Sequence, residues 1–141
     1  GSKQTLLRVL HYPPLSGQEP QGSLRAAAHG DINLLTILPA ANEPGLQVLG
    51  KDKAWHDVPC DFGLLIVNTG DMLAEASSQH YPSTVHRVLN PQGDAARKSR
   101  ISLPLFLHPR PDVVLSQRYT ADSYLKERLR ELRGEQSPGQ A

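Results

Sequence analysis

The run "AAAHGDINLLTIL" (residues 26–38) carries a histidine and an aspartate, His29 and Asp31, inside an otherwise apolar stretch. Both side chains are costly to bury without partners. If the run is a strand, residues two apart point to the same face, so the imidazole and the carboxylate can meet at one point. The pair is therefore either a strand end whose polar groups find hydrogen bonds, or part of a metal site.

Short strand-like segments account for most of the chain. Each is bounded by Gly, Pro, Asn or Asp, and turn signals separate them at regular intervals. This pattern predicts a mainly β fold, an antiparallel sandwich or barrel, rather than alternating strands and helices. The eight expected strands span residues 6–12, 24–30, 33–40, 45–50, 54–59, 63–70, 83–89 and 100–107.

Two stretches have helical periodicity. Residues 71–79 follow the turn at Gly70 and are expected to form one short helix capped by Asp71. Residues 120–132 predict a longer amphipathic helix that ends at Gly134. Its candidate caps are Thr120, Asp122 and Ser123, and its apolar stripe consists of Leu125, Leu129 and Leu132.

Composition narrows the class of protein. A chain of 141 residues with 38% hydrophobic content predicts one globular domain with its own core. Cys60 is the single cysteine, which indicates a reduced, intracellular protein. A net charge of +1, with both signs interspersed, offers no basic face for nucleic acid. No apolar run approaches the roughly 20 residues of a membrane helix, so neither a membrane partner nor a nucleic-acid partner is expected.

A third candidate ligand lies far along the chain. His86 stands in "STVHRVL" (residues 83–89), a strand-like segment with apolar neighbours. Two neutral histidines and one carboxylate on one face of a metal ion leave three positions open, an arrangement typical of non-haem Fe(II) oxygenases. His29, Asp31 and His86 are therefore candidate ligands of one metal site.

Arg100 and Ser102 in "KSRISLPLF" are again two apart, so on a strand they share a face. An arginine offers a planar fork that suits a carboxylate. A dicarboxylic keto acid could then bind the metal at one end and this pair at the other. Taken alone, such a pair usually marks a surface charge, and its position after the three candidate ligands is what favours the binding role.

Several ordered motifs resemble one known family, the isopenicillin N synthase-like branch of the Fe(II)/2-oxoglutarate-dependent oxygenases. They are "HYPP", "HGDINLLTIL", "GLQVLGKDKAWHDVP", "GLLIVNTGDML", "YPSTVHRVLNP" and "RISLPLF". The resemblance implies a double-stranded β-helix, the cupin-like jelly roll, followed by a C-terminal helix. It also implies that His29, Asp31 and His86 bind Fe(II), with no catalytic residue beyond these ligands. Arg100 and Ser102 would hold the distal carboxylate of 2-oxoglutarate, and Tyr12 would help to bind this co-substrate.

The same resemblance predicts the organisation of the chain. Residues 3–134 are expected to be the oxygenase domain, residues 1–2 an expression scar and residues 135–141 a flexible tail. Members of the family have a further N-terminal region, which we expect as a partner from the same polypeptide. Leu10 stands where the family usually has an asparagine. The C-terminal part resembles bacterial iron/ascorbate-dependent oxidoreductases, which indicates a cytoplasmic location and makes ascorbate a candidate reductant.

The expected function is oxidation of a small organic substrate by O2, coupled to oxidative decarboxylation of 2-oxoglutarate, with hydroxylation as the default outcome. Two alternatives stay open. One is a hydrolase or isomerase on the same fold that uses a divalent ion as a Lewis acid. The other is a non-catalytic binding module. Arg100 favours the oxygenase, because a hydrolase has no need of it.

Overall fold

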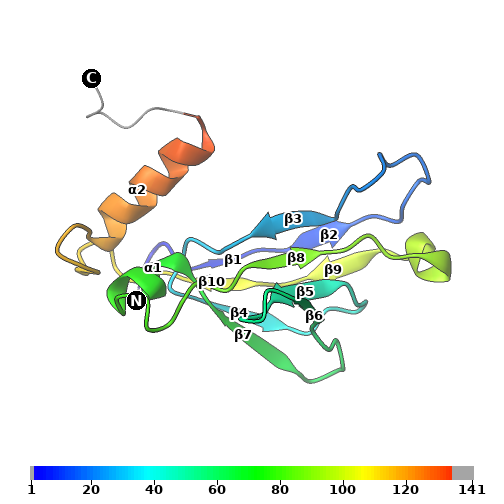
Figure 1. Ribbon diagram of the computed structural model, residues 1–141, viewed down its shortest axis with the longest axis horizontal. Helices are drawn as coiled ribbons and strands as arrows, with labels where there is room; N and C mark the ends of the chain where they lie inside the picture. The colour runs from blue at the N-terminus through cyan, green and yellow to red at the C-terminus, as the bar shows by residue number, and fades with distance from the viewer. Residues whose placement is uncertain (1, 135–141) are drawn as a thin grey trace.

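The computed structural model describes residues 2–134, which form antiparallel strands with a helix projecting from one end (Figure 1). Gly1 and the expected tail, residues 135–141, lie outside the described residues. One sheet has the order β1 (Leu6–Leu7), β10 (Leu105–Leu107), β4 (Leu35–Pro39) and β7 (Leu65–Thr69). A second has the order β3 (Ala26–His29), β8 (His86–Val88), β5 (Leu46–Leu49) and β6 (Trp55–Asp57). Strands β2 (Leu10–Tyr12) and β9 (Arg100–Ser102) form a third, two-stranded sheet.

Every strand pairing between these elements is antiparallel. All eight predicted segments contain strands, and the predicted mainly β, jelly-roll fold with a C-terminal helix is confirmed. Among the described strands, only β5 and β6 pair with their neighbour in sequence; every other pairing joins strands that are not consecutive in the chain.

Two of the predicted strands are each split in two. Residues 6–12 form β1 and β2, and residues 100–107 form β9 and β10, so that β1 pairs with β10 and β2 with β9. The break lies at Pro104, which has no N–H to donate to a ladder. Its carbonyl still accepts a hydrogen bond of 3.0 Å from the N–H of Arg8. The two paired segments, residues 6–12 and 100–107, thus pass together from one sheet to the next.

The two predicted helices are present, with one correction. Helix α1 (Asp71–Ala76) is shorter than expected, and its N-cap is Gly70, so Asp71 lies in the first turn instead of capping. Helix α2 (Ala121–Leu132) begins with a capping box in which Thr120 and Ser123 bond each other's backbone N–H groups. Gly134 follows it with a φ of 72°, a left-handed conformation that favours glycine. A short 3-10 helix, Gly93–Arg97, was not predicted.

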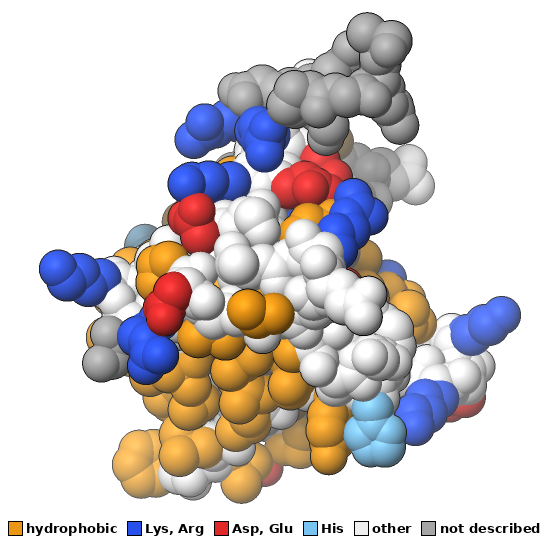
Figure 2. All heavy atoms as spheres, turned by 90° about the vertical axis from the view of Figure 1, so that its left-hand side faces the viewer, with side chains coloured by type: hydrophobic (Ala, Val, Ile, Leu, Met, Phe, Trp, Pro, Cys, Tyr) orange, Lys and Arg blue, Asp and Glu red, His pale blue; other side chains and the backbone are white. Residues whose placement is uncertain are grey.

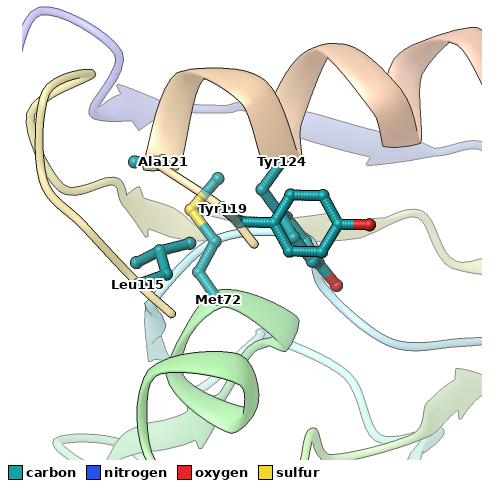
Figure 3. Packing of buried hydrophobic residues seen from close by; sticks show 5 residues of the cluster. All are labelled: Met72, Leu115, Tyr119, Ala121 and Tyr124. Atoms are coloured by element: carbon teal, nitrogen blue, oxygen red, sulfur yellow. The ribbon is translucent and has the colours of Figure 1, made fainter. Parts of the chain in front are cut away.

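One apolar cluster joins the two helices (Figure 3). Met72 of α1 packs against the beginning of α2 and the segment before it, and its side chain is fully buried. The other buried members of the cluster are Leu115, Tyr119, Ala121 and Tyr124. Of the predicted stripe on α2, Leu125 packs against this cluster, whereas Leu129 and Leu132 stay 39% and 75% exposed. Among residues 2–134, the contacts of α2 with this cluster therefore lie in its N-terminal part.

Alternate residues of the β1–β10–β4–β7 sheet face opposite ways. Thr36 and Leu38 of β4 are buried between the sheets, whereas Leu65 and Val67 of β7 are 66% and 59% exposed. Figure 2 shows hydrophobic side chains gathered over the lower part of one end of the molecule, below the charged side chains around α2. None of the described helices is long and apolar enough to cross a membrane.

Candidate metal centre

His29 and His86 face each other across two neighbouring strands. They are direct partners in the register of β3 and β8, and their ring centroids are 4.4 Å apart. His29 Nδ1 lies 2.7 Å from the carbonyl oxygen of Ala27, and His86 Nδ1 lies 3.0 Å from that of Thr84. A carbonyl can only accept, so each Nδ1 carries the proton and donates it. In the neutral imidazole Nε2 then keeps its lone pair, which is what a metal ion requires.

Asp31 completes the cluster from a turn rather than from the strand. Strand β3 ends at His29, and Asp31 lies two residues further on, where it is only 8% exposed. The carbonyl of Asp31 accepts a hydrogen bond of 2.7 Å from the N–H of Asp71, so the start of α1 holds this turn in place. Asp31 Oδ1 lies 3.7 Å from His86 Nε2.

The three side chains predicted to bind a metal therefore converge. One candidate ligand atom from each of His29, Asp31 and His86 lies within 4.8 Å of the other two. His29 is exposed, Asp31 is buried and His86 is half-buried, so the cluster opens to solvent on one side. His29 is the last residue of β3, and Asp31 lies between β3 and β4, as the predicted strand bounds 24–30 and 33–40 imply; this connection brings the two groups together.

Arg100 and Ser102 lie side by side on β9, as their spacing predicts. They are 2% and 5% exposed, whereas Ile101 between them is 44% exposed. Directly opposite Arg100 on β2 is Tyr12, whose ring centroid lies 5.5 Å from the guanidinium carbon. Arg100 Nε donates to the carbonyl of Glu43 at 3.1 Å, and its buried Nη1 has no hydrogen-bond partner. Burial, the largest influence, lowers the pKa of Arg100.

Arg25 adds a second positive charge at the same place. Its guanidinium carbon lies 6.0 Å from the Tyr12 ring centroid, so two arginines flank one tyrosine. The positive charge of Arg25 also lowers the pKa of Arg100. Within residues 2–134 no carboxylate forms an ion pair with either arginine. An anion is the ligand that such a cluster favours. Arg25 was not predicted, because it stands far from Arg100 in sequence.

A narrow cavity of about 80 Å³ connects the two groups. Its wall includes all six predicted site residues, namely Tyr12, His29, Asp31, His86, Arg100 and Ser102. Apolar side chains such as Leu38, Val48 and Ile66 form the rest of the wall. The cavity is therefore an apolar passage with a candidate metal cluster at one part and a buried positive charge at another.

A wider groove, of about 710 Å³, adjoins the cluster. It shares His29 and Asp31 with the narrow cavity and is bounded by α2. Its apolar residues are Leu6, Ile32, Phe106, Leu125, Leu129 and Leu132. Arg8 and Arg128 are its cations. The exposed leucines of α2 thus face a groove rather than a core.

Comparison with known proteins places the chain in a family. The family model of the 2OG-Fe(II) oxygenase superfamily matches residues 3–109. A "2-oxoglutarate-Fe(II) type oxidoreductase" of Aspergillus fumigatus is 38% identical over 109 residues, which are 77% of this chain and 31% of that protein. "Gibberellin 3-beta-dioxygenase 1" of Arabidopsis thaliana is 36% identical over 113 residues, 80% of this chain and 30% of that protein.

Solved structures agree with this assignment. A protein from Shewanella oneidensis is 69% identical, with a TM-score of 0.83 over 94% of this chain and 49% of its own. A full-length protein of Neurospora crassa, crystallised in complex with alpha-KG, is 28% identical, with a TM-score of 0.78 over 89% of this chain and 44% of its own. The chain spans about a third of the curated relatives that it matches and about half of these structures.

The match and the site geometry point to the same family. The segment of this chain that the family model matches, residues 3–109, includes the whole candidate metal cluster together with Tyr12, Arg100 and Ser102. The narrower isopenicillin N synthase-like branch stays a prediction. At the level of the superfamily the expectation from the motifs is confirmed, and the chain belongs to the 2OG-Fe(II) oxygenase superfamily.

Proposed function

We propose that residues 3–134 are an oxygenase domain that binds Fe(II) and 2-oxoglutarate. It would couple oxidative decarboxylation of 2-oxoglutarate to oxidation of a small organic substrate by O2, with hydroxylation as the default. One observation carries this proposal. The ligand atoms of His29, Asp31 and His86 converge within 4.8 Å, and the cavity that they line also contains the buried Arg100, whose Nη1 has no partner.

The donor set fits Fe(II). Two imidazoles with free Nε2 atoms and one carboxylate are the ligands associated with non-haem iron that keeps open positions. His29, His86 and Asp31 would hold the ion, and each histidine is already oriented by its backbone hydrogen bond. Iron bound there supplies the O2 chemistry, with ascorbate as a candidate reductant. The task of the protein is to position the reactants and to exclude water.

The cavity also fits 2-oxoglutarate. Arg100 offers an unpartnered N–H at Nη1, and Ser102 beside it offers a hydroxyl, so the two can bind the distal carboxylate of a dicarboxylic keto acid. Tyr12 lies opposite Arg100 and limits the width of the passage. Arg25 strengthens the attraction for an anion. The related Neurospora crassa structure with alpha-KG supports this choice of co-substrate.

The wide groove is the proposed place for the primary substrate. It adjoins the metal cluster through His29 and Asp31, and its walls are largely apolar. A small molecule with an apolar body fits such a groove. We also propose a cytoplasmic location, which the single cysteine supports.

A further segment of the same polypeptide is a proposed partner. The matched relatives extend well beyond the aligned part, and Leu65 and Val67 leave an exposed apolar face on the sheet. A covering segment would bury this face.

The test is release of succinate from 2-oxoglutarate in the presence of Fe(II), ascorbate and O2. The parent chain should produce succinate, and Asp31→Ala should abolish this turnover while leaving the domain folded. Equal turnover in the two proteins would refute the assignment. If Asp31→Ala does not fold, because Thr36 and Asn68 lose their acceptor, His86→Ala carries the same test.

A further inference from the structure

The two oxygens of the Asp31 carboxylate have different surroundings. Oδ1 faces the histidines, 3.7 Å from His86 Nε2. Oδ2 points the other way and accepts two hydrogen bonds, one of 2.5 Å from Thr36 Oγ1 and one of 2.9 Å from Asn68 Nδ2. Two donors fill the lone-pair directions of one carboxylate oxygen. Only Oδ1 is then free to meet a metal ion.

The direction of the hydrogen bond from Thr36 is fixed by Asn33. Asn33 is 1% exposed, and its Nδ2 donates to the carbonyl of Leu35 at 3.1 Å and to Thr36 Oγ1 at 3.0 Å. Because the Leu35 carbonyl can only accept, the Asn33 amide has one orientation. The hydroxyl of Thr36 accepts from this amide, so its single proton goes to Asp31.

The fold fixes the positions of these donors. Thr36 on β4 and Asn68 on β7 are direct partners in the register of the two strands, so their side chains reach Asp31 from neighbouring positions. Gly70 packs against Asn33 so closely that a Cβ there would overlap its carbonyl and its side chain. The hydrogen-bonded group of Asn33, Thr36 and Asn68 is thus held by strand pairing on one side and by close packing on the other.

We infer that Thr36 and Asn68, oriented in part through Asn33, are positioning residues that make Asp31 a one-oxygen ligand. This inference rests on the proposed function. Two histidines and one carboxylate oxygen leave three positions of a six-coordinate ion open. A keto acid that chelates through two atoms then leaves one position. A carboxylate bound through both oxygens would remove that position, so the two donors set how many positions the site keeps.

Matched substitutions at Thr36 test the inference. Thr36→Val removes the proton donor and nearly keeps the shape, whereas Thr36→Ser keeps the hydroxyl. Co(II) is a suitable probe metal, because its visible absorption depends on the number and arrangement of its ligands and the measurement needs no turnover. Each variant of the 141-residue chain would be titrated with Co(II), and thermal unfolding of the metal-free protein would check that it is folded.

Thr36→Val should weaken Co(II) binding by about 10- to 100-fold, as is usual when a hydrogen bond to a metal ligand is lost. It should also change the absorption spectrum of bound Co(II). Thr36→Ser should stay close to the parent in both measurements. Asn68→Leu removes the other donor and should act in the same direction as Thr36→Val, so it carries the test if that variant does not fold.

Two results would overturn the inference. One is a folded Thr36→Val or Asn68→Leu with the Co(II) affinity and spectrum of the parent. The other is a Thr36→Ser that loses as much as Thr36→Val, since shape rather than the hydroxyl would then matter. Asp31→Ala separates this failure from that of the proposed function. If Asp31→Ala binds Co(II) as the parent does, the metal site itself is wrong.

Discussion

Replacing Arg100 by methionine should keep or raise the thermal stability of the ligand-free protein, and it should reduce the stabilisation that 2-oxoglutarate provides. Arg100 is 2% exposed, no acidic side chain among residues 2–134 pairs with it, and its Nη1 has no partner. A buried charge without a counter-charge destabilises the folded state, and the lowered pKa of Arg100 has the same cause. Methionine is uncharged and flexible, and it replaces the apolar stem of the arginine without its guanidinium. The ligand-free variant should therefore unfold at the same temperature as the parent or at a higher one.

The opposite effect is expected with 2-oxoglutarate. Truncating one member of a buried charge pair costs about 2–5 kcal/mol, or roughly 30-fold to several thousand-fold in affinity. At about 100 times its dissociation constant, a ligand stabilises a protein by about 2.7 kcal/mol. For a domain of this size that corresponds to roughly 8 °C in melting temperature. With a 30-fold loss of affinity, the same ligand concentration would stabilise the variant by about 0.9 kcal/mol, or roughly 3 °C.

The assay is thermal unfolding with Mn(II) present, with and without 2-oxoglutarate. Arg97→Ala is the matched control, because Arg97 lies three residues upstream, is 81% exposed and pairs with Asp94 on the surface. The control should keep the full stabilisation by 2-oxoglutarate. The reasoning fails if Arg100→Met is stabilised as strongly as the parent, or if its ligand-free form melts several degrees lower. Either result would make Arg100 a structural residue.

Three further substitutions test other parts of the account. Gly70→Ala should lower the melting temperature by roughly 10 °C, because a Cβ would overlap the backbone of Asn33; an unchanged melting curve would contradict this packing. Burial lowers the pKa of His108 below its ordinary value of about 6.5, so the unfolded chain binds a proton more readily and stability should fall as the pH drops below about 6.5. His108→Gln should lose less stability than the parent between about pH 7 and pH 5, measured by urea unfolding, and equal slopes would exclude this role. Phe106→Ala, in the wall shared by the cavity and the groove, should reduce substrate-dependent turnover more than metal binding; equal losses in both assays would argue against that placement.

Much of the fold follows from the sequence because strand periodicity and turn residues are local signals. The split of two predicted strands could not be predicted from local signals. It depends on the pairing of β1 with β10 and of β2 with β9, and on the missing N–H of Pro104. The 3-10 helix at Gly93–Arg97 escaped prediction as well, because a single short turn has no periodicity to detect.

The candidate site was predictable where residue type and spacing carry the chemistry. Histidine, aspartate and arginine are costly to bury, so their presence in strand-like runs was informative. The direct register of His29 with His86 was not predictable, because it is set by pairing across 57 positions of sequence. Thr36 and Asn68 gave no signal, since threonine is common in strands and an asparagine two residues before a glycine suits a turn. Their role depends on their contacts with Asp31, which follow from the pairing of β4 with β7.

The most direct test of the central claim is X-ray diffraction at the iron absorption edge from crystals grown with Fe(II) and 2-oxoglutarate without O2. The account predicts one iron atom within about 2.0–2.2 Å of Nε2 of His29, Nε2 of His86 and Oδ1 of Asp31. It also predicts that the distal carboxylate of 2-oxoglutarate lies against Arg100. Iron held by other residues, or no iron between these three side chains, would contradict the account.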